Sequence, residues 1–120
     1  MSWSVTLPIK PKSYNVYLRQ HWTTRKKYHE KVHLLLLAHA SSKEPIKGPV
    51  IVHYTEWFAG RWKDITNLYG SFKPIEDCIV RLGIIEDDTP DIVTEIFAAQ
   101  HRVKTKKEQR VEIRIERVVK

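Results

Sequence analysis

The sequence predicts one α+β domain in which a mixed β-sheet carries two main helices, in the order β-α-β-α-β-β. Three observations predict this fold. Several segments alternate apolar and polar residues, as strands do, and one segment places apolar residues at helical spacing. The 120 residues also contain no internal repeat, low-complexity tract or long linker. A single domain is therefore expected over residues 1–120, a length that can bury a stable core without disulfides.

The chain is expected to begin with a short strand. Trp3, Val5 and Leu7 alternate with polar residues, which predicts a strand over these positions. Pro8 and Pro11 should end it, because proline cannot donate a hydrogen bond to a sheet.

A helix is expected next. Thr23 or Thr24 can cap this helix, which should extend to about Ala40. Its predicted apolar stripe consists of Val32, Leu35, Leu36 and His39, widened by Leu34 and Leu37.

The middle of the chain predicts a second strand and a second helix. The segment Val50–Phe58 is rich in β-branched and aromatic residues, which favours a strand. Pro74 conflicts with a long helix after it, because proline suits a first helical turn and disrupts a helix interior. We therefore favour a short turn and then a helix over residues 73–82. Thr66 or Asn67 could cap an earlier start if the helix kinks.

Two further strands are expected to complete the sheet. Gly83 should end the second helix, since glycine is the usual residue just after a helix C-terminus. The segments Ile92–Val103 and Gln109–Val119 are predicted as strands joined by Lys104–Glu108. The last strand has the clearest pattern, in which Val111, Ile113 and Ile115 alternate with charged residues.

The charge distribution favours a polyanionic partner. The net charge is +7 and the pI about 9.6, and such a surface attracts nucleic acid through its phosphates. A solvated basic surface without a specific partner is the alternative. Basic residues concentrate in the first third and near the C-terminus, whereas residues 61–100 hold four basic and eight acidic side chains. Carboxylates inside a basic protein are the combination that a nuclease needs.

Asp64, Asp87 and Asp88 are the candidate ligands of a Mg²⁺ ion, with Mn²⁺ also possible. Asp64 follows a predicted strand, and the other two follow the second helix, so a sheet-helix-sheet path could bring them together. A polar turn and a helix-entry residue are the alternative interpretation. Lys73 could stabilise phosphate charge in a transition state, or it could simply pair with Asp77 on the same helix.

Several other classes of protein are disfavoured. Cys78 is the only cysteine, so no intrachain disulfide can form. The apolar run Leu34–Ala38 is too short to span a bilayer, and Met1–Pro8 lacks the features of a signal peptide, so we expect a cytoplasmic protein without a membrane partner. His29 and His33 share a helix face, but no cysteine or carboxylate has the spacing of a zinc site.

Three segments together resemble a known family. They read KDITNL from Lys63, GSFKP from Gly70 and GIIEDDTP from Gly83. This combination resembles the RusA-type Holliday-junction resolvases, or crossover junction endodeoxyribonucleases. The pattern of that family is a basic residue, Asp-x-Asp-Asn, a lysine on the next helix and a Gly-x-x-x-Asp-Asp turn. The resemblance covers nearly the whole chain, and residues 61–90 are its specific part.

The resemblance implies a homodimeric, magnesium-dependent endonuclease of DNA recombination and repair, common in phages and prophages, that resolves four-way junctions by paired nicks. By position, Asp64 and Asp88 match the motif aspartates, and Lys73 matches the catalytic lysine. Asp87 is expected to assist Asp64 and Asp88 in holding the metal.

One position departs from the family pattern, because Thr66 stands where the second motif aspartate is expected. Asp87, Asp77 or Glu86 could supply the missing charge, or the hydroxyl could hold a metal-bound water in a weaker enzyme. In a third interpretation the chain binds junctions without cutting them. The last interpretation is the main alternative to an enzyme.

The DNA backbone is expected to contact basic and polar residues from two parts of the chain. Trp62, between two basic residues, is the aromatic side chain best placed to stack on a base. The predicted backbone contacts are Lys12, Arg19, Arg61, Lys63 and Asn67.

Overall fold

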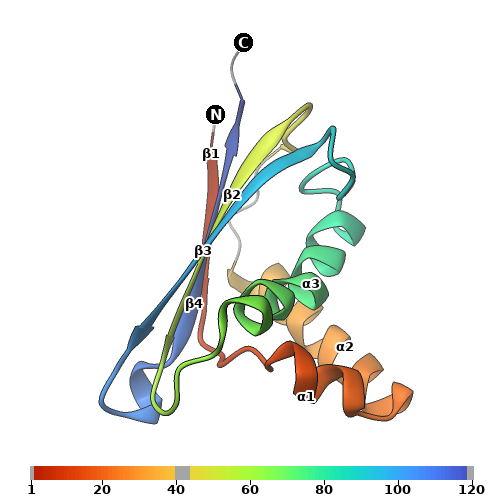
Figure 1. Ribbon diagram of the computed structural model, residues 1–120. Helices are drawn as coiled ribbons and strands as arrows, with labels where there is room; N and C mark the ends of the chain where they lie inside the picture. The colour runs from red at the N-terminus through yellow and green to blue at the C-terminus, as the bar shows by residue number, and fades with distance from the viewer. Residues whose placement is uncertain (1, 40–43, 119–120) are drawn as a thin grey trace.

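A computed structural model describes residues 2–39 and 44–118, and it has a four-stranded sheet with three helices. The helices lie on one face of the sheet, and the other face is open (Figure 1). The predicted α+β class and mixed sheet are confirmed. In chain order the elements are β1 (Ser2–Leu7), α1 (Tyr14–Arg19), α2 (Trp22–His39), β2 (Val50–Phe58), α3 (Ile65–Arg81), β3 (Val93–Arg102), a 3₁₀ turn η1 (Lys106–Glu108) and β4 (Arg110–Arg117).

The strands lie in the order β1-β4-β2-β3. β4 pairs antiparallel with both β1 and β2, whereas β2 and β3 are parallel. A parallel pair needs a crossover connection, and α3 provides it in a β-α-β unit. As a result β1, β2 and β3 all finish at the same end of the sheet, where β4 begins, and three connections meet there (Figure 1).

The hydrophobic core lies between the sheet and the helices. Along β2 every second residue is buried, which is the alternation expected of a strand covered on one face. The buried face of α3 carries Leu68, Phe72, Ile75 and Ile79 at helical spacing. One position of β2 breaks the apolar pattern, because Glu56 is fully buried among these residues.

The predicted strands are confirmed with small shifts at their ends, whereas Ala40 and Val119 lie outside the described residues. The sequence interpretation missed α1. Ser13 caps this short helix, and its Oγ accepts a hydrogen bond from the backbone N–H of Val16 at 3.4 Å. The element order therefore contains one helix more than predicted.

The predicted start of the helix over residues 73–82 is wrong. Asp64, not Thr66 or Asn67, is the N-cap, and α3 continues through Pro74. An interior proline costs about 3 kcal/mol, because it loses a hydrogen bond and its ring crowds the preceding turn. The first two turns of α3 offset this cost by burying apolar side chains against the sheet. Gly83, with φ of +74°, follows the helix as predicted.

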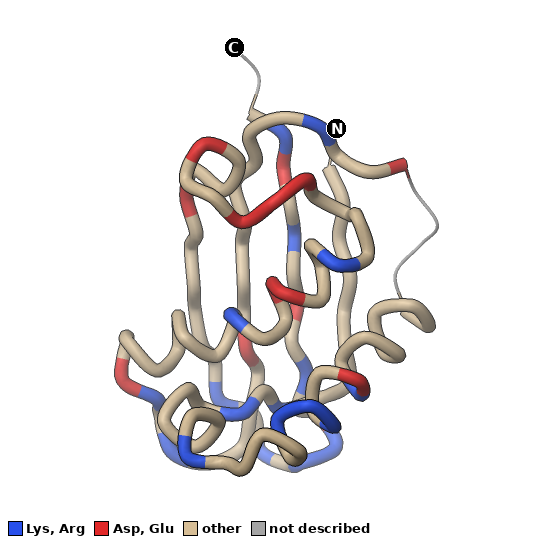
Figure 2. The backbone as a smooth tube through the Cα atoms, turned by 90° about the vertical axis from the view of Figure 1, so that its right-hand side faces the viewer, with Lys and Arg blue, Asp and Glu red and all other residues tan. Residues whose placement is uncertain are grey.

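The two ends of the sheet differ in charge. The connections 8–13, 59–64 and 103–109 meet at one end, where Lys and Arg gather (Figure 2). The acidic turn between α3 and β3 lies at the opposite end (Figure 2). Residues 61–100, acidic as a whole in the sequence, are thus divided between both ends of the molecule. No helix of the described segments is long and apolar enough to cross a membrane.

Candidate nucleic-acid interface

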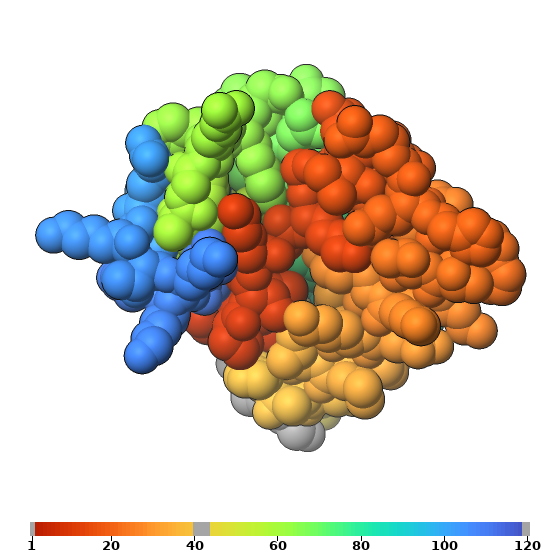
Figure 3. Space-filling view, turned by 90° about the horizontal axis from the view of Figure 1, so that it is seen from below, coloured from red at the N-terminus to blue at the C-terminus, as the bar shows by residue number. Residues whose placement is uncertain are grey.

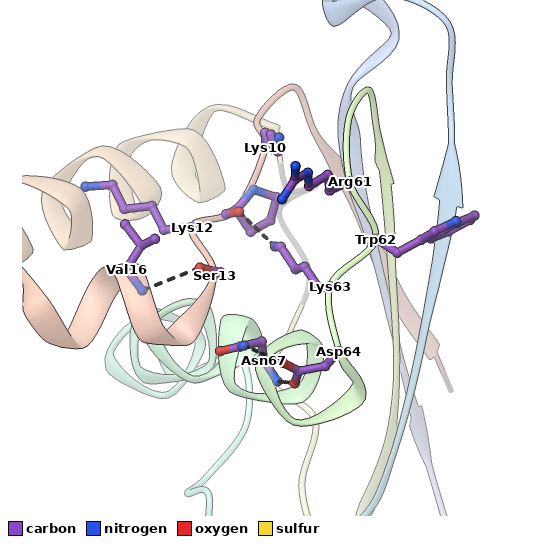
Figure 4. A pocket seen from close by; sticks show the side chains of 10 residues that line it. Lys10, Lys12, Ser13, Val16, Arg61, Trp62, Lys63, Asp64 and Asn67 are labelled. Atoms are coloured by element: carbon purple, nitrogen blue, oxygen red, sulfur yellow. Dashed lines mark hydrogen bonds between the residues drawn. The ribbon is translucent and has the colours of Figure 1, made fainter.

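A pocket of about 640 Å³, here called the basic pocket, opens at the end of the sheet where the three connections meet. It lies between the segment that follows β1 and the segment that follows β2 (Figure 4). Four of the five predicted DNA contacts therefore come together, although they are about fifty positions apart in the chain. The lining residues are Lys10, Pro11, Lys12, Ser13, Val16, Arg61, Trp62, Lys63, Asp64 and Asn67.

Hydrogen bonds fix the two walls of the basic pocket relative to each other. Lys63 Nζ donates to the carbonyl oxygen of Pro11 at 3.0 Å. The backbone N–H of Asn15 donates to Asn67 Oδ1 at 3.1 Å and joins α1 to α3. Because these contacts cross between distant segments, the pocket is held in shape by the fold itself.

Three cations of the basic pocket carry charge that no carboxylate neutralises in the described part of the chain: Lys10, Lys12 and Arg61. Lys10 Nζ donates to the carbonyl of Ala59 at 3.4 Å, and Lys12 Nζ donates to Gln20 Oε1 at 2.8 Å. Both acceptors are neutral, so the positive potential of the pocket remains available to an anion.

Lys63 differs from the other predicted DNA contacts, because its side chain is only 9% exposed. Its ammonium donates to Glu56 Oε1 at 2.6 Å, to Pro11 O at 3.0 Å and to Ser71 Oγ at 3.2 Å. Burial lowers the pKa of Lys63, and the Glu56 carboxylate opposes that shift. All three donors of Lys63 point into the protein, so we assign it a structural role beneath the pocket.

Glu56 contacts Lys63 of the basic pocket, but the sequence analysis did not identify Glu56 as a site residue. Its side chain is fully buried and accepts hydrogen bonds from Lys63 and from the Tyr54 hydroxyl. Burial, followed by the charge of Glu56, raises the pKa of Tyr54 well above its ordinary value. A signal was present in the sequence, because Glu56 occupies the same strand face as Val52 and Tyr54, where an apolar residue is expected.

Asp64 lies at the edge of the basic pocket and begins α3. Its Oδ1 accepts from the backbone N–H of Asn67 at 2.9 Å, and its Oδ2 accepts from Asn67 Nδ2 at 2.8 Å. A carboxylate in this position also interacts favourably with the positive end of the helix dipole. Asp64 and Asn67, both predicted site residues, therefore stabilise the start of α3 and also line the basic pocket.

Lys73 and Asp88 come together, although the only partner that the sequence suggested for Lys73 was Asp77. The Lys73 ammonium binds the Asp88 carboxylate and also lies 3.3 Å from Asp77 Oδ1 and 3.5 Å from Glu76 Oε1. The hydrogen bond with Asp88 raises the pKa of Lys73 and lowers that of Asp88. Asp87 supports the turn, because its Oδ1 accepts from the backbone N–H of Asp88 at 2.8 Å.

The three predicted metal ligands do not form one ligand set. Across residues 2–39 and 44–118, no three His, Cys, Asp or Glu side chains are grouped so that they could hold a metal ion. Asp64 caps the start of α3, whereas Asp88 binds Lys73 nine residues further along that helix. Nine helical residues extend about 13 Å along the axis. The residues present thus do not fit the predicted Mg²⁺ site in this conformation.

The contact between Lys73 and Asp88 predicts a pH-dependent stability. Asp88→Asn should lower the free energy of unfolding by about 0.5 kcal/mol near neutral pH, a small value because the side chains are 48% and 29% exposed. The pKa of Asp88 is lower in the folded protein than the ordinary value of about 3.9. The contribution is therefore complete above about pH 4 and disappears as the pH falls through the lowered pKa.

Urea unfolding of both proteins at several pH values checks this prediction. The difference between wild type and Asp88→Asn should shrink in acid, and a difference that stays constant down to about pH 2 contradicts it. Asp91→Asn, at an exposed aspartate without an ion pair among the residues described, is the control.

The remaining candidates lie outside the pocket or point away from it. Arg19 ends α1, and its Nε donates to the carbonyl of Asn15 at 3.2 Å. Trp62 is 54% exposed and points away from the pocket interior (Figure 4), with the Arg102 guanidinium 5.6 Å from its ring centroid. His29 bonds the Tyr17 hydroxyl at 2.5 Å, and burial lowers the pKa of His29. Its environment is that of a histidine packed between two helices.

The fold and this pocket define a small α+β domain with a cavity lined by Lys, Arg and polar side chains at one end of a mixed sheet. No protein-family model matches the chain, and no curated protein shows significant sequence similarity to it.

Proposed function

We propose that this chain binds DNA and that the basic pocket holds part of the phosphate backbone. The proposal depends on one observation above all, the convergence of Lys10, Lys12 and Arg61 from two distant segments onto one cavity. The hydrogen-bond partners of Lys10 and Lys12 are neutral, and Arg61 forms no ion pair among the described residues, so phosphates can replace the counterions that these side chains attract. The resemblance of residues 61–90 to the RusA-type family favours branched DNA as the substrate.

The double variant Lys12→Gln/Arg61→Gln tests this proposal. We expect it to bind a four-way DNA junction about tenfold more weakly than wild type at low salt. The slope of log affinity against log salt should also fall by about 1 to 2, since each phosphate contact contributes about 0.9. Fluorescence anisotropy over a salt series measures both quantities.

A matched control removes the same charge from elsewhere. Lys26 and Lys47 are exposed and do not line the basic pocket, so Lys26→Gln/Lys47→Gln should retain nearly wild-type affinity. The proposal fails if the wild type shows no salt-sensitive DNA binding, or if both double variants lose affinity equally.

A second candidate function is cleavage of four-way junctions by paired nicks, in the presence of Mg²⁺ or Mn²⁺. Two observations favour it: Asp64 lies at the edge of the basic pocket, and Lys73 contacts Asp88, the two residues that match the lysine and the later aspartate of the family pattern. Symmetric cutting needs two sites, so this function also requires the proposed homodimer. Against it stand the separation of Asp64 from Asp88 and the neutral Thr66.

Asp64→Asn separates the catalytic role of Asp64 from its capping role. Asparagine caps a helix about as well as aspartate, so the variant should fold with little change in stability. If Asp64 takes part in cleavage, junction nicking with Mg²⁺ or Mn²⁺ should fall at least tenfold while DNA binding persists. Asp64→Ala, which also removes the cap, should cost about 1 kcal/mol of stability.

The outcomes distinguish the two candidate functions. Wild-type binding without any cutting contradicts the enzyme and leaves a junction-binding protein. Cutting that Asp64→Asn does not affect contradicts the assignment of Asp64 instead.

A further inference from the structure

A second cavity, of about 500 Å³, lies beside the basic pocket and is here called the lysine basin. Lys10 and Lys12 line both cavities. Seen from below, the segment after β1 lies between α2 on one side and the segment after β2 on the other (Figure 3). The lysine basin is lined by Pro8, Ile9, Lys10, Lys12, Thr24, Lys27, Tyr28 and Lys31, with no carboxylate among them.

The four lysines of the lysine basin repel one another, and this repulsion lowers the stability of the fold. Lys27 and Lys31 are four residues apart on α2, where like charges repel each other. None of the four lysines forms an ion pair within the portion of the chain that the structure describes. An anion in the basin would relieve this repulsion, since it would face four positive charges and no negative one.

Tyr28 fixes the floor of the lysine basin. It is 7% exposed, and its hydroxyl accepts a hydrogen bond from the backbone N–H of Lys12 at 3.2 Å. The Lys12 ammonium lies 4.8 Å from the centroid of the same ring. Burial raises the pKa of Tyr28 to about 12, so the hydroxyl stays neutral and does not cancel the lysine charges. The basin is thus a rigid surface formed by α2 and the segment after β1.

We infer that the lysine basin binds a second backbone segment of the same DNA, on the other side of Lys10 and Lys12 from the segment in the basic pocket. This inference rests on the proposed DNA-binding function. It specifies the kind of substrate, because a duplex or junction presents two backbones side by side and a short single strand presents one. Lys10 and Lys12 then lie between two rows of phosphates and contribute to both.

The double variant Lys27→Gln/Lys31→Gln tests the inference on the full chain. Its affinity for a four-way junction should fall about five- to tenfold at low salt, and its salt slope should decrease by about 1 to 2. Its affinity for a single strand of about eight nucleotides should stay within about twofold of wild type, because a single strand presents one backbone and the basic pocket remains to hold it.

Lys26→Gln/Lys47→Gln is again the matched control. Lys26 is next to Lys27 on the same helix but lines a different cavity, so the control removes two charges without changing the basin. Thermal unfolding of each variant verifies that the exposed substitutions leave the fold intact.

Failure of the inference and failure of the proposed function can be told apart. If the wild type binds no DNA, both are overturned. If the wild type binds the junction and Lys12→Gln/Arg61→Gln weakens it, but Lys27→Gln/Lys31→Gln behaves like the control, only the lysine basin is overturned. An equal loss of affinity for the junction and the short strand also overturns the inference, since the two cavities would then act as one.

Discussion

Replacement of Lys63 by methionine is expected to lower the free energy of unfolding by about 3–5 kcal/mol. Methionine has similar length but no charge, and it would leave Glu56 buried with only the Tyr54 hydroxyl as a partner. It would also remove the hydrogen bonds that Lys63 donates to Pro11 and Ser71. The effect is large because an uncompensated charge in a low-dielectric interior has lost its hydration without gaining a counterion.

Urea unfolding of Lys63→Met beside Lys73→Met measures this effect against a matched control. Both substitutions remove a lysine that contacts carboxylates, but Lys73 is 48% exposed and Lys63 only 9%. Water screens the exposed contacts, so Lys73→Met should cost about 1 kcal/mol or less. Similar losses in the two variants would contradict the burial argument.

A double variant tests whether the coupling is specific. Glu56→Met/Lys63→Met removes both charges, so it should be clearly more stable than the sum of the two single losses predicts. Additive losses would show that Glu56 and Lys63 contribute through packing and not through their contact.

Because Lys63 also binds Pro11, the single variant Lys63→Met should loosen the wall of the basic pocket and weaken DNA binding as well.

Gly70→Ala is expected to lower the free energy of unfolding by about 1–3 kcal/mol, although the same change in a helix ordinarily gains up to about 1 kcal/mol. A Cβ at position 70 would lie 2.5 Å from Cγ, 2.6 Å from Cβ and 2.9 Å from Cδ2 of Tyr14. These atoms are at the base of the tyrosine side chain. Tyr14 therefore cannot relieve the clash by rotation, and the backbone of α1 must move away from α3.

The second-site variant Tyr14→Gly distinguishes steric overlap from other effects. In the Tyr14→Gly background, which removes the Tyr14 Cβ as well as its ring, Gly70→Ala should be neutral or stabilising, since the overlap is removed and the helix propensity of alanine remains. Thermal or urea unfolding of the four proteins gives the coupling energy. A destabilisation that persists without the whole Tyr14 side chain would contradict the explanation.

Gly70→Ala should also affect DNA binding, because α1 and its cap form part of the basic pocket. Ser13 and Val16 line the pocket, and the contact between Asn15 and Asn67 holds α1 against α3. A displaced α1 would alter the pocket without changing its charge. We therefore expect weaker binding with an unchanged salt slope, unlike the effect of Lys12→Gln/Arg61→Gln.

The strands were predictable because their signal is local. In β4, Val111, Ile113 and Ile115 alternate with charged residues, and this pattern requires one buried and one exposed face in any fold that contains it. β2 was predicted correctly from its β-branched and aromatic residues, which is also a local signal. Lys12, Arg61 and Asn67 were predicted as DNA contacts from their chemistry and from the family resemblance, and the structure brings them to one pocket.

The predicted helices differ from the observed ones where a local conformational preference competes with a contact between distant residues. Pro74 disfavours a helix by its own geometry, but the burial of Leu68 and Phe72 against the sheet extends α3 back to Ile65. The helix α1 is too short to be stable alone, and its packing on Gly70 is visible only when α3 is in place.

The residue pattern alone predicted an α+β domain with a mixed sheet, a net positive charge and carboxylates concentrated in residues 61–100. The distribution of these charges in space follows from the fold instead. The crossover through α3 leaves Asp64 at the basic end and carries Asp87 and Asp88 toward the other, and the covered face of β2 buries Lys63 with Glu56. Charge depends on residue type alone, but whether a charge meets solvent, a partner or a ligand depends on contacts between residues far apart in the chain.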